Sequence, residues 1–377
     1  MSGMIEAMEN SAFLRRPKKI LHLRSTFHAG GTENLIVHFF NRPSAAFEIT
    51  LVLMKPGPLM HSLAPSANRV VRLYRKQKFD LRFLGKLARL VAGLRPDYIH
   101  THQPIELFYA FLMKCFFPGV KLIHQVHLYN PRANWGFFLE KFIVRHLARR
   151  LVVVSRSLEE QLASRGYPLK KMTVLPNIVQ RTHHLSAADK AKFRHRINLQ
   201  PGEALIGMIG NFVPEKDQAT LARAFRMIME DFPNAKLVFI GKESPEQQAC
   251  KQVFRPEELE KRAYFIGPWP HASELLPLFT LSVFSSRQET FGMAAIESLL
   301  YEVPLIASDI PVMRELSLDG RHFELFETGN ATGLARRLRD RLSRPPDRQK
   351  LEQARKYAEK AFNAETYIHQ LDQLYHS

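Results

Sequence analysis

Two glutamates, Glu289 and Glu297, stand eight residues apart on either side of a Phe291–Gly292 pair. In one continuous helix this separation is about 12 Å of rise and about 80° of rotation, so the carboxylates could not act on one atom. If the helix instead begins near Gly292, the glutamates can contact opposite ends of one extended ligand, and the free N–H groups between them can bind a diphosphate. The spacing favours such a site over the alternative, a pair of solvated helix acids.

Further candidate residues follow other predicted strands. Lys216, in "GNFVPEKD", comes after a strand and a turn, where an ammonium can neutralise charge growing on a leaving diphosphate. Gly30 and Gly31 form a tight turn that exposes amides to an anion or a sugar. His127 ends the strand "KLIHQV". Similar strand ends carry histidines that we interpret as structural or cleft-lining, since none has metal-ligand spacing with a carboxylate: His22, His100, His102 and His124.

Short apolar strands alternate with helical patterns along nearly the whole chain. The order starts with "KILHLRS" at Lys18, is interrupted by a polar stretch from Gln180 to Gly202, and restarts with "ALIGMIGN". Such alternation predicts an α/β fold with two doubly wound, Rossmann-like domains of mostly parallel sheet. We expect the domains to face a central cleft at the carboxyl ends of their strands, where ligands bind in such folds.

Composition indicates a globular protein without a membrane span. The chain has 377 residues, of which 45% are hydrophobic and 24% charged, enough for about two domains. Cys115 and Cys250 lie far apart without a CxxC motif, which argues against a disulfide framework and fits a reducing cytosol. The longest apolar stretch, residues 107–120, is interrupted by Lys114 and falls short of the ~18 residues of a span.

The positive charge is concentrated in the first half. Residues 1–200 hold 32 Lys and Arg against 11 Asp and Glu, whereas residues 201–377 hold 22 against 25, within a net charge of +18. The segment Arg69–Arg95 has nine basic residues against one acid, Asp80. One such segment alone is typical of a solvated helix face, but the asymmetry between the halves favours an anionic partner on the first domain.

An ordered set of motifs gives the chain a family resemblance: "HAGGTEN", "LIHQVH", "VVVSRSLEEQL", "VLPN", "GNFVPEKDQATLARAF", "LVFIGK" and "SSRQETFGMAAIESL". From about Lys18 to the C-terminus the sequence resembles glycosyltransferases of the GT-B architecture, specifically family 4 of the group 1 type, which are retaining nucleotide-sugar transferases. Residues 1–17 carry two acids and no apolar core of signal-peptide length, so we expect a loose leader there, and the polar composition predicts a linker at 183–202. The resemblance implies an acceptor-binding domain at 18–182, a nucleotide-sugar-binding domain at 203–360 and a C-terminal helix at 361–377 that crosses back to the first domain.

The resemblance also implies roles for individual residues. Catalytic roles fall on His127, near the reacting carbon, on Glu289, near the sugar hydroxyls, and on Lys216, while Glu297 contacts the ribose hydroxyls. The full set of implied donor-binding residues is Gly30, Gly31, Asn211, Lys216, Glu289, Thr290, Phe291, Gly292, Met293 and Glu297. Family members commonly carry an arginine where this chain has Asn211, so one cationic contact to the diphosphate is missing.

The chain contains no Asp-x-Asp, the usual metal-diphosphate clamp of the other main transferase fold. We therefore expect activity without a metal and no cofactor besides the nucleotide diphospho-sugar substrate. The resemblance further implies a glycan acceptor, lipid-linked or anionic, in cell-envelope synthesis. The alternatives are a nucleotide-sugar epimerase of the same fold, a basic nucleic-acid-binding protein and a glycosidase. No nucleic-acid motif accompanies the basic residues, and the glutamate pair cannot converge across one bond.

The basic segment also predicts where the protein works. Arg75, Lys76, Lys78 and Arg82 are accompanied by apolar residues in the same and the next segment, namely Leu81, Phe83, Leu84, Leu87, Leu90, Val91, Phe108, Phe111, Phe116 and Phe117. These apolar residues fit either the core or a face that docks on anionic lipid. We expect a cytoplasmic protein that is peripheral on the inner face of the membrane through its first domain.

Overall fold

The computed structural model describes residues 16–28, 31–42, 44–64, 68–128 and 135–377. The chain divides into two compact units. The first unit runs to Ile178 and also includes Ala364–Ser377, and the second comprises Val179–Asn363. No helix in the described part of the chain is long and apolar enough to cross a bilayer.

The first unit is built on a seven-stranded parallel sheet in the order β3-β2-β1-β4-β5-β6-β7. Its strands are β1 (Lys18–Arg24), β2 (Phe47–Leu53), β3 (Arg69–Arg72), β4 (Tyr98–Thr101), β5 (Lys121–Val126), β6 (Ala148–Val153) and β7 (Met172–Val174). The strand order reverses between β1 and β4, where His22 pairs with His100. Ligands of doubly wound folds bind at the carboxyl edge beside this reversal.

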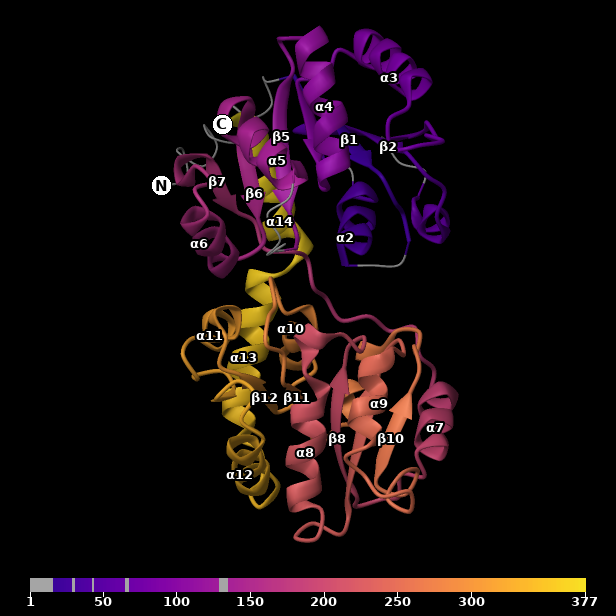
Figure 1. Ribbon diagram of the computed structural model, residues 1–377, viewed down its shortest axis with the longest axis vertical. Helices are drawn as coiled ribbons and strands as arrows, with labels where there is room; N and C mark the ends of the chain where they lie inside the picture. Colours follow the sequence, from indigo (N-terminus) through magenta and orange to yellow (C-terminus); the bar gives the residue numbers. More distant parts are fainter. Residues whose placement is uncertain (1–15, 29–30, 43, 65–67, 129–134) are drawn as a thin grey trace, which may run out of the picture. The chain divides into compact units, whose positions relative to one another are not determined.

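Helices connect these strands (Figure 1). They are α2 (Gly31–Phe40), η1 (Pro58–Ser62), α3 (Leu81–Leu94), α4 (Pro104–Phe116), α5 (Trp135–His146), α6 (Arg156–Ser164), η2 (Leu169–Lys171) and α14 (Ala364–His376). The last helix is part of the core of the first unit, because Tyr367 stacks on Phe39 and Tyr375 packs edge-on against Phe47.

The second unit has a six-stranded parallel sheet in the order β10-β9-β8-β11-β12-β13. Its strands are β8 (Ala204–Ile209), β9 (Ala235–Ile240), β10 (Ala263–Ile266), β11 (Leu281–Phe284), β12 (Leu305–Ser308) and β13 (Glu324–Phe326). Its helices are α7 (Ala187–Arg196), η3 (Pro214–Lys216), α8 (Gln218–Ile228), α9 (Pro245–Lys251), η4 (Ala272–Leu278), α10 (Met293–Leu300), α11 (Pro311–Ser317), α12 (Ala331–Leu342) and α13 (Arg348–Ala361).

Both faces of this second sheet are covered. Leu237 and Phe239 of β9 belong to one hydrophobic cluster with α8, and the alternating residues Val238 and Ile240 belong to another cluster with α7 and η4. Alternation of this kind places successive side chains on opposite faces. The strand order reverses between β8 and β11, so the loops after these two strands meet at one edge.

The structure corrects three sequence-based predictions. The segment 183–202, predicted as a linker, contains α7, whose Phe193 is fully buried in the second unit. Phe193 is the one large apolar residue of α7, and the other apolar residues of this helix are alanines, so the sequence pattern is too weak to indicate a packed helix. The segment Arg69–Arg95, interpreted from its charge as a basic helical segment, starts with β3, and α3 begins only at Leu81 after the cap at Asp80. The last helix begins at Ala364 rather than at residue 361, because α13 runs to Ala361.

Candidate active site

The loop between β11 and α10 ends at the N-terminus of α10, at the carboxyl edge of the second sheet. Gly292 is the N-cap of α10, with φ of 81°, a conformation that favours glycine. A Cβ at this position would lie 3.0 Å from side-chain atoms of both Leu316 and Met313. Because glycine has no side chain to cap the helix, the first N–H groups of α10 stay available to an anion.

Lys216 and Glu289 meet at this edge of the sheet. Their side chains form a salt bridge and are 25% and 14% exposed, so both remain accessible to a ligand. Ser286 donates a second hydrogen bond, of 3.2 Å, to the same carboxylate. The loops after β8 and β11 are fixed against each other, because the Ser285 hydroxyl donates to the Asp217 carbonyl at 2.8 Å. A cation and an anion are thus held together beside the start of α10.

Glu297 lies in the second turn of α10, and no direct hydrogen bond to Glu289 is present among the described residues. Glu297 is only half-buried, but its carboxyl group is desolvated, which raises its pKa to about 7 despite a hydrogen bond with Ser273. Near neutral pH this group can therefore change protonation state. The two glutamates bracket the helix start without touching, as the spacing predicts.

The remaining candidates of the second unit have different environments. The Asn211 side chain accepts a 3.0 Å hydrogen bond from the Lys242 amide, so it connects the loops after β8 and β9. Phe291 is 5% exposed and packs edge-on against Phe362, which makes its side chain a core group and leaves only its backbone for a ligand. Thr290 and Met293 are half-buried beside Gly292.

The first unit carries a buried ion cluster at the ends of β1 and β4. Arg24, 1% exposed, forms salt bridges with Glu33 of α2 and with Glu106 of α4. Glu106 also accepts hydrogen bonds from the amides of Ser25 and His102, both at 2.7 Å. Sequence reasoning missed this cluster, although Arg24 ends a strand as His127 does. Gly31 is the exposed first residue of α2, and Gly30 lies outside the described residues.

A chain of histidines runs inward from His127. Its Nε2 lies 3.1 Å from Nδ1 of His102, and Nε2 of His102 lies 3.2 Å from Nδ1 of His22. The Tyr375 hydroxyl then lies 3.1 Å from Nε2 of His22. Desolvation, with a further contribution from Arg24, lowers the pKa of His127 to about 3, so its imidazole is neutral at pH 7.

The histidines that the sequence indicates to be structural or cleft-lining are all buried. His22, His100 and His124 are buried, and Nδ1 of His124 lies 2.8 Å from the Thr101 hydroxyl. His102 is buried too, but it is the hydrogen-bonding neighbour of His127 and so sets the orientation of that ring.

One group in the described part of the chain has the arrangement of metal ligands, and it lies outside the sequence-predicted residues. His184, His271 and Glu274 place their ligand atoms within 4.8 Å of one another. The Glu274 carboxylate already accepts hydrogen bonds from the Thr182 hydroxyl and from the amides of His184 and Leu185. These donors occupy the oxygens that a cation would need.

The chain has two parallel-sheet units, in each of which the strand order reverses once and polar groups lie at the carboxyl edge. This arrangement defines the GT-B architecture. HepE from Anabaena, solved in complex with UDP and glucose, matches with a TM-score of 0.78 over 95% of this chain and 99% of its own, at 19% identity. The lipopolysaccharide outer core galactosyltransferase WaaB, in its apo form, matches with a TM-score of 0.68 over 94% and 98%, at 16% identity.

Sequence comparison identifies the family. The model for glycosyltransferase family 4 matches residues 29–182, and that for group 1 glycosyl transferases matches residues 189–361. Among the curated relatives, the N-acetyl-alpha-D-glucosaminyl L-malate synthase of Bacillus anthracis is 24% identical over 79% of either chain. The putative glycosyltransferase EpsD of Bacillus subtilis is 23% identical over 80% of this chain and 82% of its own. The chain belongs to the family 4, group 1 glycosyltransferases, enzymes that use nucleotide-sugar donors.

Proposed function

We propose that the chain transfers a sugar from a nucleotide diphospho-sugar to a cell-envelope glycan, with retention of configuration and without a metal. The observation that carries this proposal is the Lys216–Glu289 pair beside the open start of α10. Lys216 neutralises charge on the departing diphosphate, and the helix N–H groups bind its oxygens. These two contributions replace a divalent cation, consistent with the absence of Asp-x-Asp.

Other residues position the sugar and the nucleoside. Glu289 accepts hydrogen bonds from the sugar hydroxyls, and Glu297, when ionised, accepts them from the ribose. His127 contributes a neutral imidazole, which hydrogen bonds a hydroxyl without adding positive charge. The retaining outcome and these contacts rest on the resemblance to family 4.

We also propose that the acceptor is lipid-linked or anionic and that the first unit docks on anionic membrane. The support is electrostatic: Arg82, Lys86 and Arg89 are exposed on α3. Three of the apolar residues expected to insert, Phe83, Leu87 and Val91, are buried in the core, whereas Leu81 and Phe116 are 82% and 62% exposed. The contribution of the basic side chains should make docking weak at high salt. Replacing Arg75, Lys76, Lys78 and Arg82 with Glu should release the protein from anionic vesicles while nucleotide-sugar binding persists.

A thermal-shift screen of nucleotide sugars with different bases and sugars tests the donor assignment. A donor at 100 times its Kd adds about 2.7 kcal/mol to the free energy of unfolding by mass action. The stabilising compound is then offered with glycan acceptors, and the anomeric configuration of the product is read by NMR. Absence of stabilisation by every nucleotide sugar in the screen contradicts the proposal, and inversion at the anomeric carbon contradicts the retaining mechanism.

A further inference from the structure

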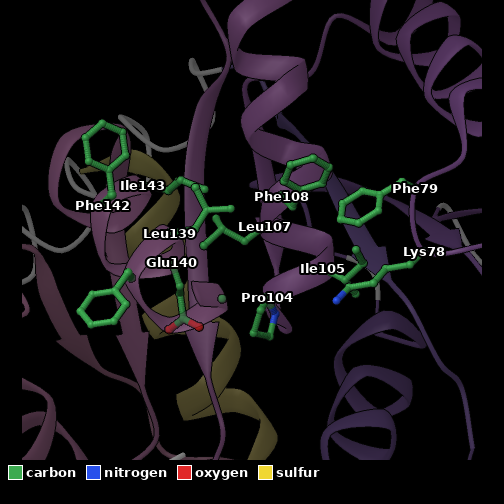
Figure 2. A pocket seen from close by; sticks show the side chains of 12 residues that line it. Lys78, Phe79, Pro104, Ile105, Leu107, Phe108, Leu139, Glu140, Phe142 and Ile143 are labelled. Atoms are coloured by element: carbon green, nitrogen blue, oxygen red, sulfur yellow. The ribbon is translucent and has the colours of Figure 1, made fainter. Parts of the chain in front are cut away.

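An apolar pocket of about 650 Å³ lies between α4 and α5 of the first unit. In Figure 2, Phe79 and Phe108 lie on one side of this pocket and Leu139 and Ile143 on the other. Its volume falls within the range of about 300–1,000 Å³ that is typical of small-molecule sites. Its lining is almost wholly aliphatic and aromatic, which fits a hydrocarbon ligand rather than a sugar.

Aromatic side chains stay exposed around this pocket. Phe79, Phe138 and Phe142 are 59%, 58% and 54% exposed, although all three line the same hollow. Single exposed apolar residues are ordinary on protein surfaces, but a contiguous concave group marks a binding site. The pocket thus presents apolar surface that a ligand can cover.

The pocket reaches the edge of the sheet that carries His127. Pro104 and Ile105, in the first turn of α4, and Gly136, at the start of α5, belong to its lining. These helices follow β4 and β5, so their first turns lie at the carboxyl ends of the strands. A chain lying between the helices would therefore place its polar end at the same edge as the candidate residues.

Charge at the pocket favours an anionic head group. Lys78 lines the pocket, with its Nζ 5.8 Å from the ring centroid of Phe79, and it forms no ion pair within the described residues. Of the two neighbouring carboxylates, Glu140 also lines the pocket, and both it and Asp80 already accept hydrogen bonds. Asp80 accepts hydrogen bonds from the amides of Lys76 and Phe83, and Glu140 accepts one of 2.9 Å from the Tyr167 hydroxyl.

We propose that this pocket binds the hydrocarbon chain of a lipid-phosphate acceptor, with Lys78 contacting the phosphate. The inference rests on the proposed function, since it specifies the acceptor of the same reaction. It commits to the acceptor's own chain rather than to bilayer lipid, because the pocket continues to the first turns of α4 and α5, where a bound chain would present its phosphate at the edge that carries the candidate residues.

Alkyl phosphates below their micellar concentration test the proposal. Octyl, decyl and dodecyl phosphate are titrated into the full chain by calorimetry, and affinity should rise by up to about fourfold per methylene. Phe142→Asp and Phe138→Asp should each weaken dodecyl phosphate binding by at least tenfold. Phe116→Asp is the matched control, because Phe116 is 62% exposed on α4 but does not line the pocket. Lys78→Gln should weaken decyl phosphate and leave 1-decanol unchanged.

Three outcomes would overturn the assignment: affinity independent of chain length, equal binding by the Phe142→Asp and Phe116→Asp variants, or binding to anionic vesicles without binding to monomeric alkyl phosphate. The last would make this face a membrane-docking surface. Nucleotide-sugar binding is measured on the same preparations. If the unmodified chain binds nucleotide sugar but not alkyl phosphate, only the pocket proposal is contradicted. If the unmodified chain binds no nucleotide sugar, the proposed function is contradicted.

Discussion

The hydroxyl of Tyr375, near the end of α14, lies 2.8 Å from Nδ1 of the buried His100. The same hydroxyl lies 3.1 Å from Nε2 of His22. The Tyr375 hydroxyl is thus within hydrogen-bonding distance of two buried imidazoles, and it connects α14 to the histidine chain that ends at His127.

Removing that hydroxyl should destabilise the first unit. Tyr375→Phe leaves two buried ring nitrogens without this partner, which costs about 1–3 kcal/mol in the free energy of unfolding. Urea denaturation measures the loss. Tyr74→Phe is the control, because Tyr74 is 45% exposed and its hydroxyl contacts only the Met60 sulfur, at 3.8 Å, among the described residues. Equal stability of the two variants would contradict a structural role for the phenol.

Lys216→Ala should abolish most sugar transfer without unfolding the protein. The lysine is partly exposed and contacts Glu289 rather than the core, and in the proposed mechanism its charge stabilises the transition state by several kcal/mol. We expect kcat/KM to fall at least a hundredfold with the melting temperature unchanged within about 2 °C. Lys242→Ala, which removes an exposed lysine from the loop after β9, should retain activity. A Lys216→Ala enzyme with the normal rate and donor affinity would refute the assigned role.

Glu297→Gln should change how stability depends on pH. The folded protein raises the pKa of Glu297 from 4.5 to about 7 by desolvation, so the acid stabilises the fold fully below about pH 4.5 and loses this contribution as pH rises through 7. The glutamine variant does not titrate. It should therefore exceed the parent in stability by about 1–3 kcal/mol at pH 8.5, with little difference near pH 4.5.

Donor binding provides the complementary measurement. In the proposed binding mode an ionised Glu297 accepts hydrogen bonds from the ribose hydroxyls, so the affinity of the parent for its nucleotide sugar should increase between pH 6 and 8. The Glu297→Gln variant should bind more weakly at pH 8 and show no such increase. A parent affinity that is flat across this range would remove Glu297 from the nucleotide site.

Mild acid should destabilise the first unit through its buried histidines. Desolvation lowers the pKa of His22 and His127 to about 3 and that of His124 to about 4, against 6.5 in the unfolded chain. Their contribution is present above pH 6.5 and is lost progressively below it. Each buried histidine should lower the free energy of unfolding by up to about 1.4 kcal/mol for every pH unit below 6.5. Denaturation at pH 6.5, 6.0, 5.5 and 5.0 should show a smaller slope for His124→Asn than for the exposed-site variant His146→Asn.

Transfer activity should survive chelation. In the proposed mechanism, Lys216 and the open start of α10 supply the positive potential that a cation would otherwise provide. EDTA should therefore leave the initial rate unchanged. A loss of rate that Mg²⁺ or Mn²⁺ restores would show that these groups are insufficient.

Much of the second unit could be predicted from short stretches of sequence. The strand, turn and helix that position Lys216 lie within a few residues of it, and the same is true of Glu289. Their meeting depends on β8 and β11 being neighbours, which follows from the doubly wound topology and not from either segment alone. The Arg24–Glu106 pair could not be predicted, since its members are 82 residues apart in sequence and neither has a distinctive neighbour. Periodicity likewise identified apolar residues without showing which are covered: Val91 is buried while Phe142 is exposed.

The placement of α14 has a consequence for biosynthesis. Tyr367, Leu371 and Tyr375 complete the core around β1 and β2, yet they are translated only after the whole second unit. Domains ordinarily fold as they emerge, beginning at the N-terminus. Here the second unit can complete its own core first, while the earlier-made unit keeps apolar surface uncovered until α14 has been translated. A nascent chain arrested before Ala364 would therefore carry an incomplete first unit, a substrate for chaperones and proteases.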